Sequence, residues 1–255
     1  MNVSSRLIDT RTQIGARRGR DGQRWPQPDA PADYRSAVIS ATRSRILDVA
    51  VLLYRRLGHK KTTVIDIAHE ISMSPANCYR FFRSKQAIKE AVVGRLLEQV
   101  IAAAVDAARG AGSATGRLQA VLQEVERLHK DRCMQEKRLH DLVATATREN
   151  WTSVRAYSEQ LEAIVAQVIA DGQVHGEFRK GDPMTVARCI VAATEFYTNP
   201  LVIGASARFA RPTPDQMREF CVRGLREVWG VCTASSNRSV VGRSAQLPLQ
   251  TVSRC

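Results

Sequence analysis

The sequence predicts an all-α protein in two helical parts, and three observations support this fold class. Apolar residues recur at three- and four-residue steps through most of residues 36–231, which is the period of a helix with one buried face. No segment of useful length alternates apolar and polar residues as a half-buried strand does. Residues 62–85 carry three helix-start signals in close succession. We therefore divide the chain into residues 1–35, 36–95, 96–231 and 232–255.

Positive charge is concentrated outside the long third segment. The formal net charge of the chain is +13. Residues 36–95 hold 11 basic and 4 acidic side chains, whereas residues 96–231 hold 17 of each. The first segment holds 7 basic and 4 acidic side chains, and the last holds 3 basic and none acidic. This placement predicts a polyanionic partner, such as nucleic acid, for the second segment and the two ends.

The second segment begins with a long helix, expected from Tyr34 or Ser36 to Leu57, and continues with a short one. Thr63 followed three residues later by Asp66 has the form of a capping box, which marks a helix start. Apolar residues then follow at helical spacing as far as the turn, and the short helix is expected to end near Glu70. These apolar residues are Val64, Ile67, Ala68 and Ile71.

A second short helix follows a tight turn at residues 71–73. Ser74 is its predicted N-cap, and Pro75 occupies the first helical position, where its missing N–H costs nothing. The helix is expected to run to about Phe82, and Ser84 caps a third start immediately afterwards. Two short helices joined by a tight turn in a basic surround predict a helix-turn-helix, whose second helix enters the DNA major groove.

This region resembles the DNA-binding domain of the TetR family of bacterial transcription regulators. The matching motifs are T-T-V-x-D-I-A from Thr62 and M-S-x-A-x-x-Y-x-x-F-x-S-K from Met73, preceded by an apolar ladder. The ladder consists of Ile46, Val49, Ala50, Leu53 and Leu57. One position differs from the usual family sequence: Ser72 occupies the turn, where the family usually has glycine. The resemblance implies an N-terminal three-helix helix-turn-helix domain, followed by a larger helical domain that binds an effector and dimerises.

The second short helix supplies the candidates for DNA contact. Asparagine can bond adenine and arginine can bond guanine through two hydrogen bonds, so Asn77 and Arg80 are the first candidates for base readout, with Pro75 and Ala76 beside them. Cys78 and Phe82 are expected to point inward. Candidates for phosphate contact lie around the two helix starts and, for Tyr79 and Lys85, follow from the family resemblance. These candidates are Thr63, Tyr79, Lys85, Lys61 and Ser74.

Some of these residues also have plainer interpretations. Thr63 can be a helix cap only, Tyr79 a half-buried ring with a wet hydroxyl, and Arg80 a solvated cation. Residues 1–35 form a polar, basic arm that cannot build a core, and residues 232–255 a disordered tail. The arm either follows the DNA backbone or minor groove, or is a solvated extension or an upstream start codon chosen in error.

The third segment is expected to hold helices at 84–109, 117–130, 134–150, 151–175, 183–199 and 214–231, with a break at 110–116. The last two carry apolar stripes, which in the resembling family pack as a four-helix bundle between two subunits. The alternative is that the stripes face the chain's own core. The dimer candidates are Val186, Ile190, Ala193, Met217, Cys221, Leu225 and Val228.

An effector pocket is expected in the same segment, but the chemical class of its ligand cannot be read from the sequence. The candidate lining residues are Trp151, Tyr157, Phe196, Tyr197, His140 and His129. His129 and Cys133 lie four residues apart, but without a second pair at ligand spacing we expect no metal and no cofactor.

We therefore expect a DNA-binding transcription regulator. It would be a homodimeric repressor that binds an inverted-repeat operator in double-stranded DNA and is released by a small molecule. The alternatives are an architectural DNA-binding protein that senses nothing, and an enzyme in residues 96–231. No nucleophile elbow, phosphate loop or zinc-protease motif supports the enzyme. Six cysteines without regular spacing and no long apolar run predict a cytoplasmic protein that does not span a membrane.

Overall fold

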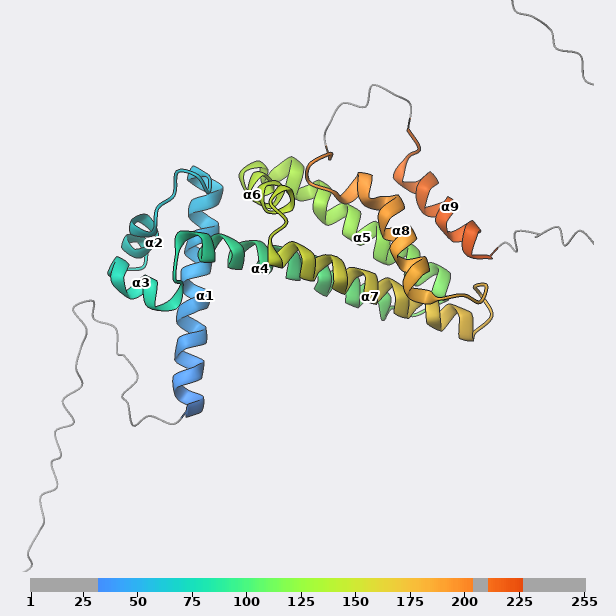
Figure 1. Cartoon of the computed structure of the whole chain (residues 1–255), viewed down its shortest axis with the longest axis horizontal. Helices are drawn as coiled ribbons and strands as arrows, with labels where there is room; N and C mark the ends of the chain where they lie inside the picture. Colours follow the sequence, from blue (N-terminus) through green and yellow to red (C-terminus); the bar gives the residue numbers. More distant parts are fainter. Residues whose placement is uncertain (1–31, 204–210, 227–255) are drawn as a thin grey trace, which may run out of the picture.

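A computed structural model describes residues 32–203 and 211–226 of the chain, and these residues form nine α-helices and no strand. The predicted all-α class is confirmed. Most of the predicted arm, the whole predicted tail and Val228 lie outside the described residues. In Figure 1 the helices divide into a small head containing α1–α3 and a longer bundle containing α5 and α7–α9, joined by α4.

The head is built from α1 (Ala32–Leu57), α2 (Val64–Glu70) and α3 (Pro75–Phe81). Its core contains the predicted residues Ile46, Ala50 and Leu53, but Leu57 of the expected ladder is 45% exposed. Tyr54 takes the buried place instead and is fully buried. Leu57 is the last residue of α1, just before Gly58 adopts a φ of 85°, so the chain turns away before its side chain reaches the core.

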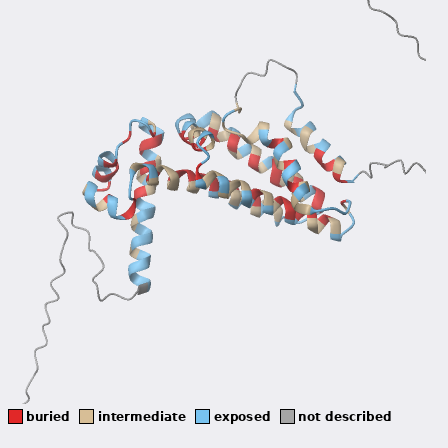
Figure 2. Ribbon diagram, in the orientation of Figure 1, coloured by how far each residue is buried: buried red, intermediate tan, exposed pale blue. Residues whose placement is uncertain are grey.

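The helix α4 (Lys85–Ala108) belongs to both parts of the molecule. Its N-cap is Ser84, whose hydroxyl oxygen accepts a hydrogen bond from the Ala87 N–H at 3.0 Å. Residues of its first half, such as Ile88 and Val92, are buried in the core of the head. Residues of its second half, such as Val100, are buried in the core of the bundle. One continuous helix therefore connects the two cores (Figures 1 and 2).

The bundle contains α5 (Ala114–Gln135), α7 (Thr152–Val174), α8 (Pro183–Thr198) and α9 (Pro214–Arg226), while α6 (Lys137–Arg148) lies between bundle and head. Helices α4, α5 and α7 pack side by side, and α8 and α9 cover α5 and α7. The expected break at 110–116 is too long, because Ser113 caps α5 and Gly116 lies inside the helix. The expected boundary after residue 130 is also wrong, since α5 continues to Gln135 and α6 begins at Lys137.

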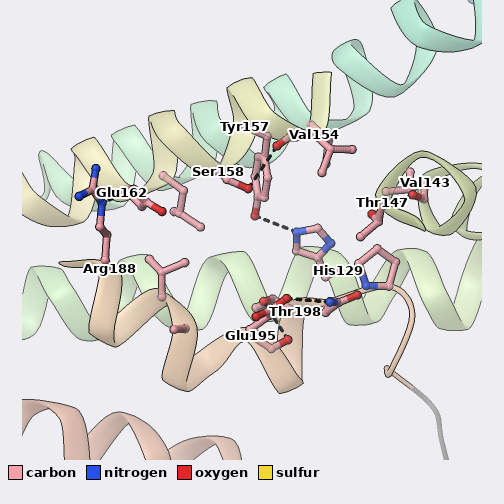
Figure 3. Close-up of a pocket in the computed structure, with 16 residues that line it drawn as sticks. His129, Val143, Thr147, Val154, Tyr157, Ser158, Glu162, Arg188, Glu195 and Thr198 are labelled. Atoms are coloured by element: carbon pink, nitrogen blue, oxygen red, sulfur yellow. Dashed lines mark hydrogen bonds and ion pairs between the residues drawn. The ribbon is translucent and has the colours of Figure 1, made fainter. Parts of the chain in front are cut away.

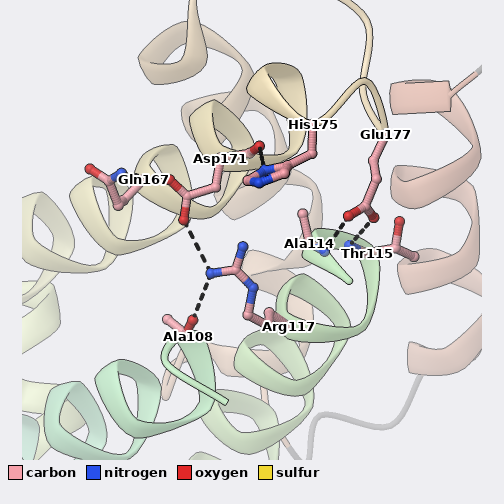
Figure 4. Close-up of polar contacts among 8 residues, drawn as sticks. All are labelled: Ala108, Ala114, Thr115, Arg117, Gln167, Asp171, His175 and Glu177. Atoms are coloured by element: carbon pink, nitrogen blue, oxygen red, sulfur yellow. Dashed lines mark hydrogen bonds and ion pairs between the residues drawn. The ribbon is translucent and has the colours of Figure 1, made fainter. Parts of the chain in front are cut away.

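Two polar contacts fix the turn between α4 and α5 against the end of α7 (Figure 4). The Glu177 carboxylate accepts hydrogen bonds from the N–H groups of Ala114 at 2.8 Å and Thr115 at 3.1 Å. It thereby caps the N-terminus of α5 from a distant part of the chain. The Arg117 guanidinium donates to the Ala108 carbonyl at 3.2 Å and to the Asp171 carboxylate at 3.1 Å.

Candidate nucleic-acid interface and effector cavity

The start of α2 has the predicted capping box. The Thr63 hydroxyl accepts from the Asp66 N–H at 3.1 Å, and the Asp66 carboxylate accepts from the Thr63 N–H at 2.8 Å. The Thr63 hydroxyl also donates to that carboxylate, at 2.8 Å. These bonds hold the pKa of Asp66 below its usual range. Thr63 is exposed although it caps the helix, so a phosphate could still approach it at the surface.

The turn before α3 contains the predicted departure from glycine. Ser72 has a φ of 54°, in the left-handed region that costs a residue with a Cβ about 1–2 kcal/mol. The turn still closes, because the Met73 N–H reaches the Ala68 carbonyl at 2.8 Å and the Ser72 N–H reaches the His69 carbonyl at 3.0 Å. Ser74 then caps α3 by accepting from the Asn77 N–H at 3.3 Å.

Helix α3 divides into a buried and an exposed face, as the sequence predicted. Cys78 and Phe82 are buried, together with Phe81, which the sequence analysis did not place in the core. Pro75, Ala76, Tyr79 and Arg80 are exposed, and Asn77 is partly exposed. The exposed face of α3 is therefore short, and it carries the predicted base-contact candidates.

Asn77 shows a feature that its predicted role did not anticipate. Its side-chain oxygen is buried and makes no hydrogen bond to any described residue. Bidentate recognition of adenine uses both the oxygen and the nitrogen of the amide. The Asn77 side chain must therefore rotate before it can read an adenine in this way.

The predicted phosphate-binding lysines lie together at the junction of the α1–α2 loop with α4. The Lys85 ammonium donates to the carbonyl oxygen of Lys60 at 3.0 Å, and Lys61 is exposed in the same loop. Arg43 of α1 has a role that the sequence did not reveal. Its guanidinium stacks over the Phe82 ring at 4.2 Å and donates to the Phe81 carbonyl, so it fixes the end of α3 against α1.

A cavity of about 250 Å³ opens in the bundle between α5, α6, α7 and α8 (Figure 3). Much of its wall is apolar, and the polar groups come from α5, α7 and α8 and from the end of α6. The lining residues are Leu97, His129, Val143, Thr147, Val154, Tyr157, Ser158, Leu161, Glu162, Arg188, Val191, Ala192, Glu195, Thr198, Asn199 and Pro200. Through Leu97, α4 also contributes to this wall.

The most buried polar contact of the cavity joins His129 of α5 to Tyr157 of α7. The His129 Nε2 and the Tyr157 hydroxyl lie 2.9 Å apart, and the two rings meet edge to face with centroids 5.7 Å apart. Burial, with smaller contributions from Arg132 and His140, lowers the pKa of His129 to about 3. Burial also raises the pKa of Tyr157 above its usual range. Both side chains are therefore uncharged near neutral pH.

The structure distributes the predicted pocket residues unevenly. Tyr157 and His129 line the cavity, whereas Trp151, His140, Phe196 and Tyr197 do not. The Trp151 indole is buried and donates to Glu149 at 2.8 Å, and the Tyr197 hydroxyl donates to the Pro212 carbonyl at 2.7 Å. The lining residues Glu162, Arg188 and Glu195 were not anticipated, because charged residues on helices give no sequence signal that distinguishes a cavity wall from a solvated face.

Part of the predicted dimer interface belongs to the chain's own core. Ile190, Cys221 and Leu225 are 5%, 8% and 4% exposed in the single chain and pack in the core of the bundle. The alternative interpretation of the stripes therefore holds for these three residues. Val186, Ala193 and Met217 are partly buried against the same core. Phe220 of α9, which the stripes did not include, is 69% exposed.

Comparison with known families and structures agrees with this architecture. Residues 46–92 match the family described as bacterial regulatory proteins, tetR family, and residues 114–213 match the tetracyclin repressor-like C-terminal domain. Together the two matches cover more than half of the chain. No curated protein matches the sequence.

Solved structures show the same fold at low identity. A TetR/AcrR-family regulator from Thermobifida fusca is 22% identical with a TM-score of 0.52, and the alignment covers 74% of this chain and 98% of that one. A putative TetR-family regulator from Mesorhizobium loti is 18% identical with a TM-score of 0.53, covering 73% and 95%. A putative transcriptional regulator from Pseudomonas aeruginosa is 14% identical with a TM-score of 0.52, covering 76% and 89%.

Among the described residues, no helix is long and apolar enough to cross a membrane. The sequence motifs, the three-helix head with its capped α2 and α3, the helical bundle and the two family matches all lead to one assignment. This chain belongs to the TetR family of transcriptional regulators.

Proposed function

We propose that this protein is a homodimeric repressor that binds an inverted-repeat operator and releases it when a small molecule occupies the bundle cavity. The observation that carries the proposal is the exposed face of α3, whose N-terminus is capped by Ser74, beside the lysines at the junction of the α1–α2 loop with α4. A protein with these features can place α3 in the major groove while its basic residues meet the phosphates. Such a role belongs in the bacterial cytoplasm.

The dimer follows from the small size of the reading head. One α3 of seven residues reads only a few base pairs, whereas two heads related by a two-fold axis read a palindrome. We place the dimer contact on the outer faces of α8 and α9. The exposed Phe220 is its anchor, since a ring 69% exposed on a helix gains from burial against a partner.

Effector control follows from the position of α4. This helix carries Lys85 at the DNA-binding end and Leu97 in the cavity wall. In one state of the dimer the distance between the two heads matches the operator, and in the other state it does not. A ligand that binds the second state more tightly shifts the population toward that state. The shift cannot exceed the difference between the ligand's affinities for the two states. The cavity also supports a sensing regulator over an architectural protein, which needs no such space.

Selection of random duplex DNA by the purified protein, at two salt concentrations, tests this function. We expect an enriched inverted repeat with half-sites about one helical turn apart, or a multiple of that distance. Salt-sensitive binding without an enriched motif would instead support the architectural role. Absence of any binding would contradict a DNA-binding function for the protein in this state.

A further inference from the structure

We propose that the bundle cavity selects an uncharged, mainly aliphatic ligand whose single hydroxyl or carbonyl group meets the His129–Tyr157 pair. This inference rests on the proposed function and names the chemical class of the effector. It starts from the arrangement in Figure 3, where the Tyr157 hydroxyl and the His129 ring point toward each other and are joined by a hydrogen bond in the cavity wall.

The pair can serve a ligand donor or a ligand acceptor without becoming charged. If His129 Nε2 carries the hydrogen, it donates to the Tyr157 oxygen and leaves the phenolic O–H free to donate elsewhere. If the phenol donates instead, the second hydrogen of the pair sits on His129 Nδ1. In both arrangements His129 stays neutral, because the residue is only 4% exposed and a charged imidazole would lose most of its hydration there. The pair therefore suits a hydroxyl or a carbonyl, but offers no charge to balance an ionised group.

The charged groups of the wall already have partners. Arg188 Nε and the Glu162 carboxylate form an ion pair at 3.1 Å. The Glu195 carboxylate accepts from the Asn199 side-chain amide at 2.8 Å. The Arg188–Glu162 pair has no net charge, and the Arg188 side chain is 64% exposed to solvent, so a ligand carboxylate would gain little from it. A ligand ammonium would have to compete with Asn199 for Glu195.

Arg132 is the buried cation that could best pair with an anionic ligand, but its position outside the cavity wall disfavours such a contact. It is 7% exposed, and neither its Nε nor its Nη1 finds a hydrogen-bond partner among the described residues. However, Arg132 does not line the cavity, and its Nη2 donates to the Leu96 carbonyl at 3.0 Å. Its positive charge lowers the pKa of His129 and so helps keep that ring neutral. An anion would reach Arg132 only after the wall had rearranged.

Most of the remaining wall is aliphatic, and this wall limits the size of the ligand. The hydroxyls of Thr147, Ser158 and Thr198 already donate to carbonyl groups of their own helices. Leu97, Val143, Leu161 and Val191 come from four different helices and contribute no hydrogen-bonding side chain. A cavity of about 250 Å³ lies below the usual range for drug-sized ligands, about 300–1,000 Å³. A short alkyl chain with one polar end fits both the size and the chemistry.

Calorimetric titration of the full-length protein with 1-octanol, octanoate and octylamine at neutral pH tests the proposal. The three probes share one chain and differ in the charge of the polar end. We expect octanol to bind at least about tenfold more tightly than either charged probe, since an unpaired charge in the cavity costs more than the about 1.4 kcal/mol that this ratio represents.

Two variants locate the octanol site. Tyr157→Phe should weaken octanol by about three- to tenfold, the effect of one lost neutral hydrogen bond. Tyr197→Phe is the matched control, because it removes a phenolic hydroxyl of the same domain outside the cavity and should leave octanol affinity unchanged. Should Tyr157→Phe fail to fold, Ala192→Phe fills the cavity from an exposed position of α8 and should abolish binding.

If octanoate binds more tightly than octanol, the proposal is wrong and Arg132 is the expected partner of the ligand carboxylate. If octylamine binds more tightly than octanol, the proposal is also wrong and Glu195 is the expected partner of the ligand ammonium. Failure of all three probes to bind overturns the aliphatic class. The same preparations are assayed for operator selection without any probe. An enriched inverted repeat together with a failed probe test refutes only the ligand class, and the absence of an enriched motif refutes the regulator.

Discussion

The guanidinium of Arg138 in α6 donates a hydrogen bond to the carbonyl oxygen of Arg56 in the last turn of α1. The same guanidinium nitrogen donates to the Arg55 carbonyl at 3.2 Å, and the Arg55 side chain pairs with Glu136 at 2.5 Å. The bundle therefore holds the C-terminal end of α1 at carbonyl groups that a helix leaves without internal partners. Because Val143 of α6 also lines the cavity, α6 provides a second connection from the cavity to the head, besides α4.

Replacing Arg138 by methionine should loosen the loop that follows α1. Methionine is a long, unbranched side chain like arginine, but it has no N–H groups to donate to the Arg55 and Arg56 carbonyls. Loss of about 0.5–1.5 kcal/mol of hydrogen-bond energy should speed amide exchange in residues 58–62 by about two- to tenfold. Hydrogen–deuterium exchange mass spectrometry measures this effect. Arg148→Met removes another arginine of α6 that lines the same surface groove, and equal exchange in both variants would contradict the proposed contact.

Lys85→Ala should weaken DNA binding to all sequences alike. The ammonium lies at the start of α4, next to the α1–α2 loop, where a phosphate contact carries no sequence information. Removing one such contact should lower the slope of log affinity against log salt by about one. Binding titrations at several salt concentrations, on operator and random duplex, measure both effects. Lys180→Ala, beyond the end of α7, is the control and should change neither.

Asn77→Ala should instead relax the base preference at one position of each half-site, at a cost of about 1–3 kcal/mol for the preferred base. The reason is that a base contact distinguishes sequences, whereas the phosphate contact proposed for Lys85 does not. Repeating the DNA selection with the variant measures this change. Unchanged specificity would show that the amide, whose oxygen is buried in the free protein, stays turned away from the bases.

The head could be predicted from the sequence because its determinants are local. The hydroxyl of Thr63 and the carboxylate of Asp66 lie three residues apart, and Ser74 caps α3 within the same short span. The bundle was less predictable because its decisive contacts join distant positions. An apolar stripe that contains Ile190 or Leu225 predicts that these side chains are buried. It does not indicate whether they pack against their own chain or against a second subunit.

The site in the bundle was only partly predictable for the same reason. Tyr157 was a candidate as an aromatic residue in a helix of the third segment, and His129 as a histidine in a neighbouring one. Their contact bridges 28 residues, and nothing in the local spacing predicts it. The same holds for Glu177, which caps a helix that begins 63 residues earlier in the chain.

Ser72→Gly should stabilise the head. Its φ of 54° is costly for serine, and glycine adopts this region freely. We expect the free energy of unfolding to rise by about 1 kcal/mol, after allowance for the greater entropy of glycine in the unfolded chain. Asn150→Gly is a matched control, because Asn150 has a φ of 51° but asparagine tolerates this region better, so its gain should be smaller. Urea denaturation of both variants measures the difference, and an equal or larger gain at Asn150 would contradict the assignment of strain to Ser72.

Glu177→Gln should reduce the dependence of stability on acid pH. The hydrogen bonds from the backbone of Ala114 and Thr115 hold the pKa of Glu177 below its usual range in the folded protein. A depressed folded pKa contributes stability that is present above the unfolded pKa of about 4.3 and is lost as the pH falls through the folded value. The wild type should therefore lose more stability than the variant across this acid window.

At neutral pH the same variant should lose about 0.5–2 kcal/mol, because glutamine has one acceptor oxygen for two N–H groups and no charge for the helix N-terminus. Urea denaturation at neutral pH and at a series of acid pH values measures both effects. Glu159→Gln removes an exposed carboxylate from α7 and should leave the acid dependence close to that of the wild type. If the two variants behaved alike, the cap between Glu177 and α5 would not contribute to folding, because of these two glutamates it is Glu177 that accepts from the N-terminus of a distant helix.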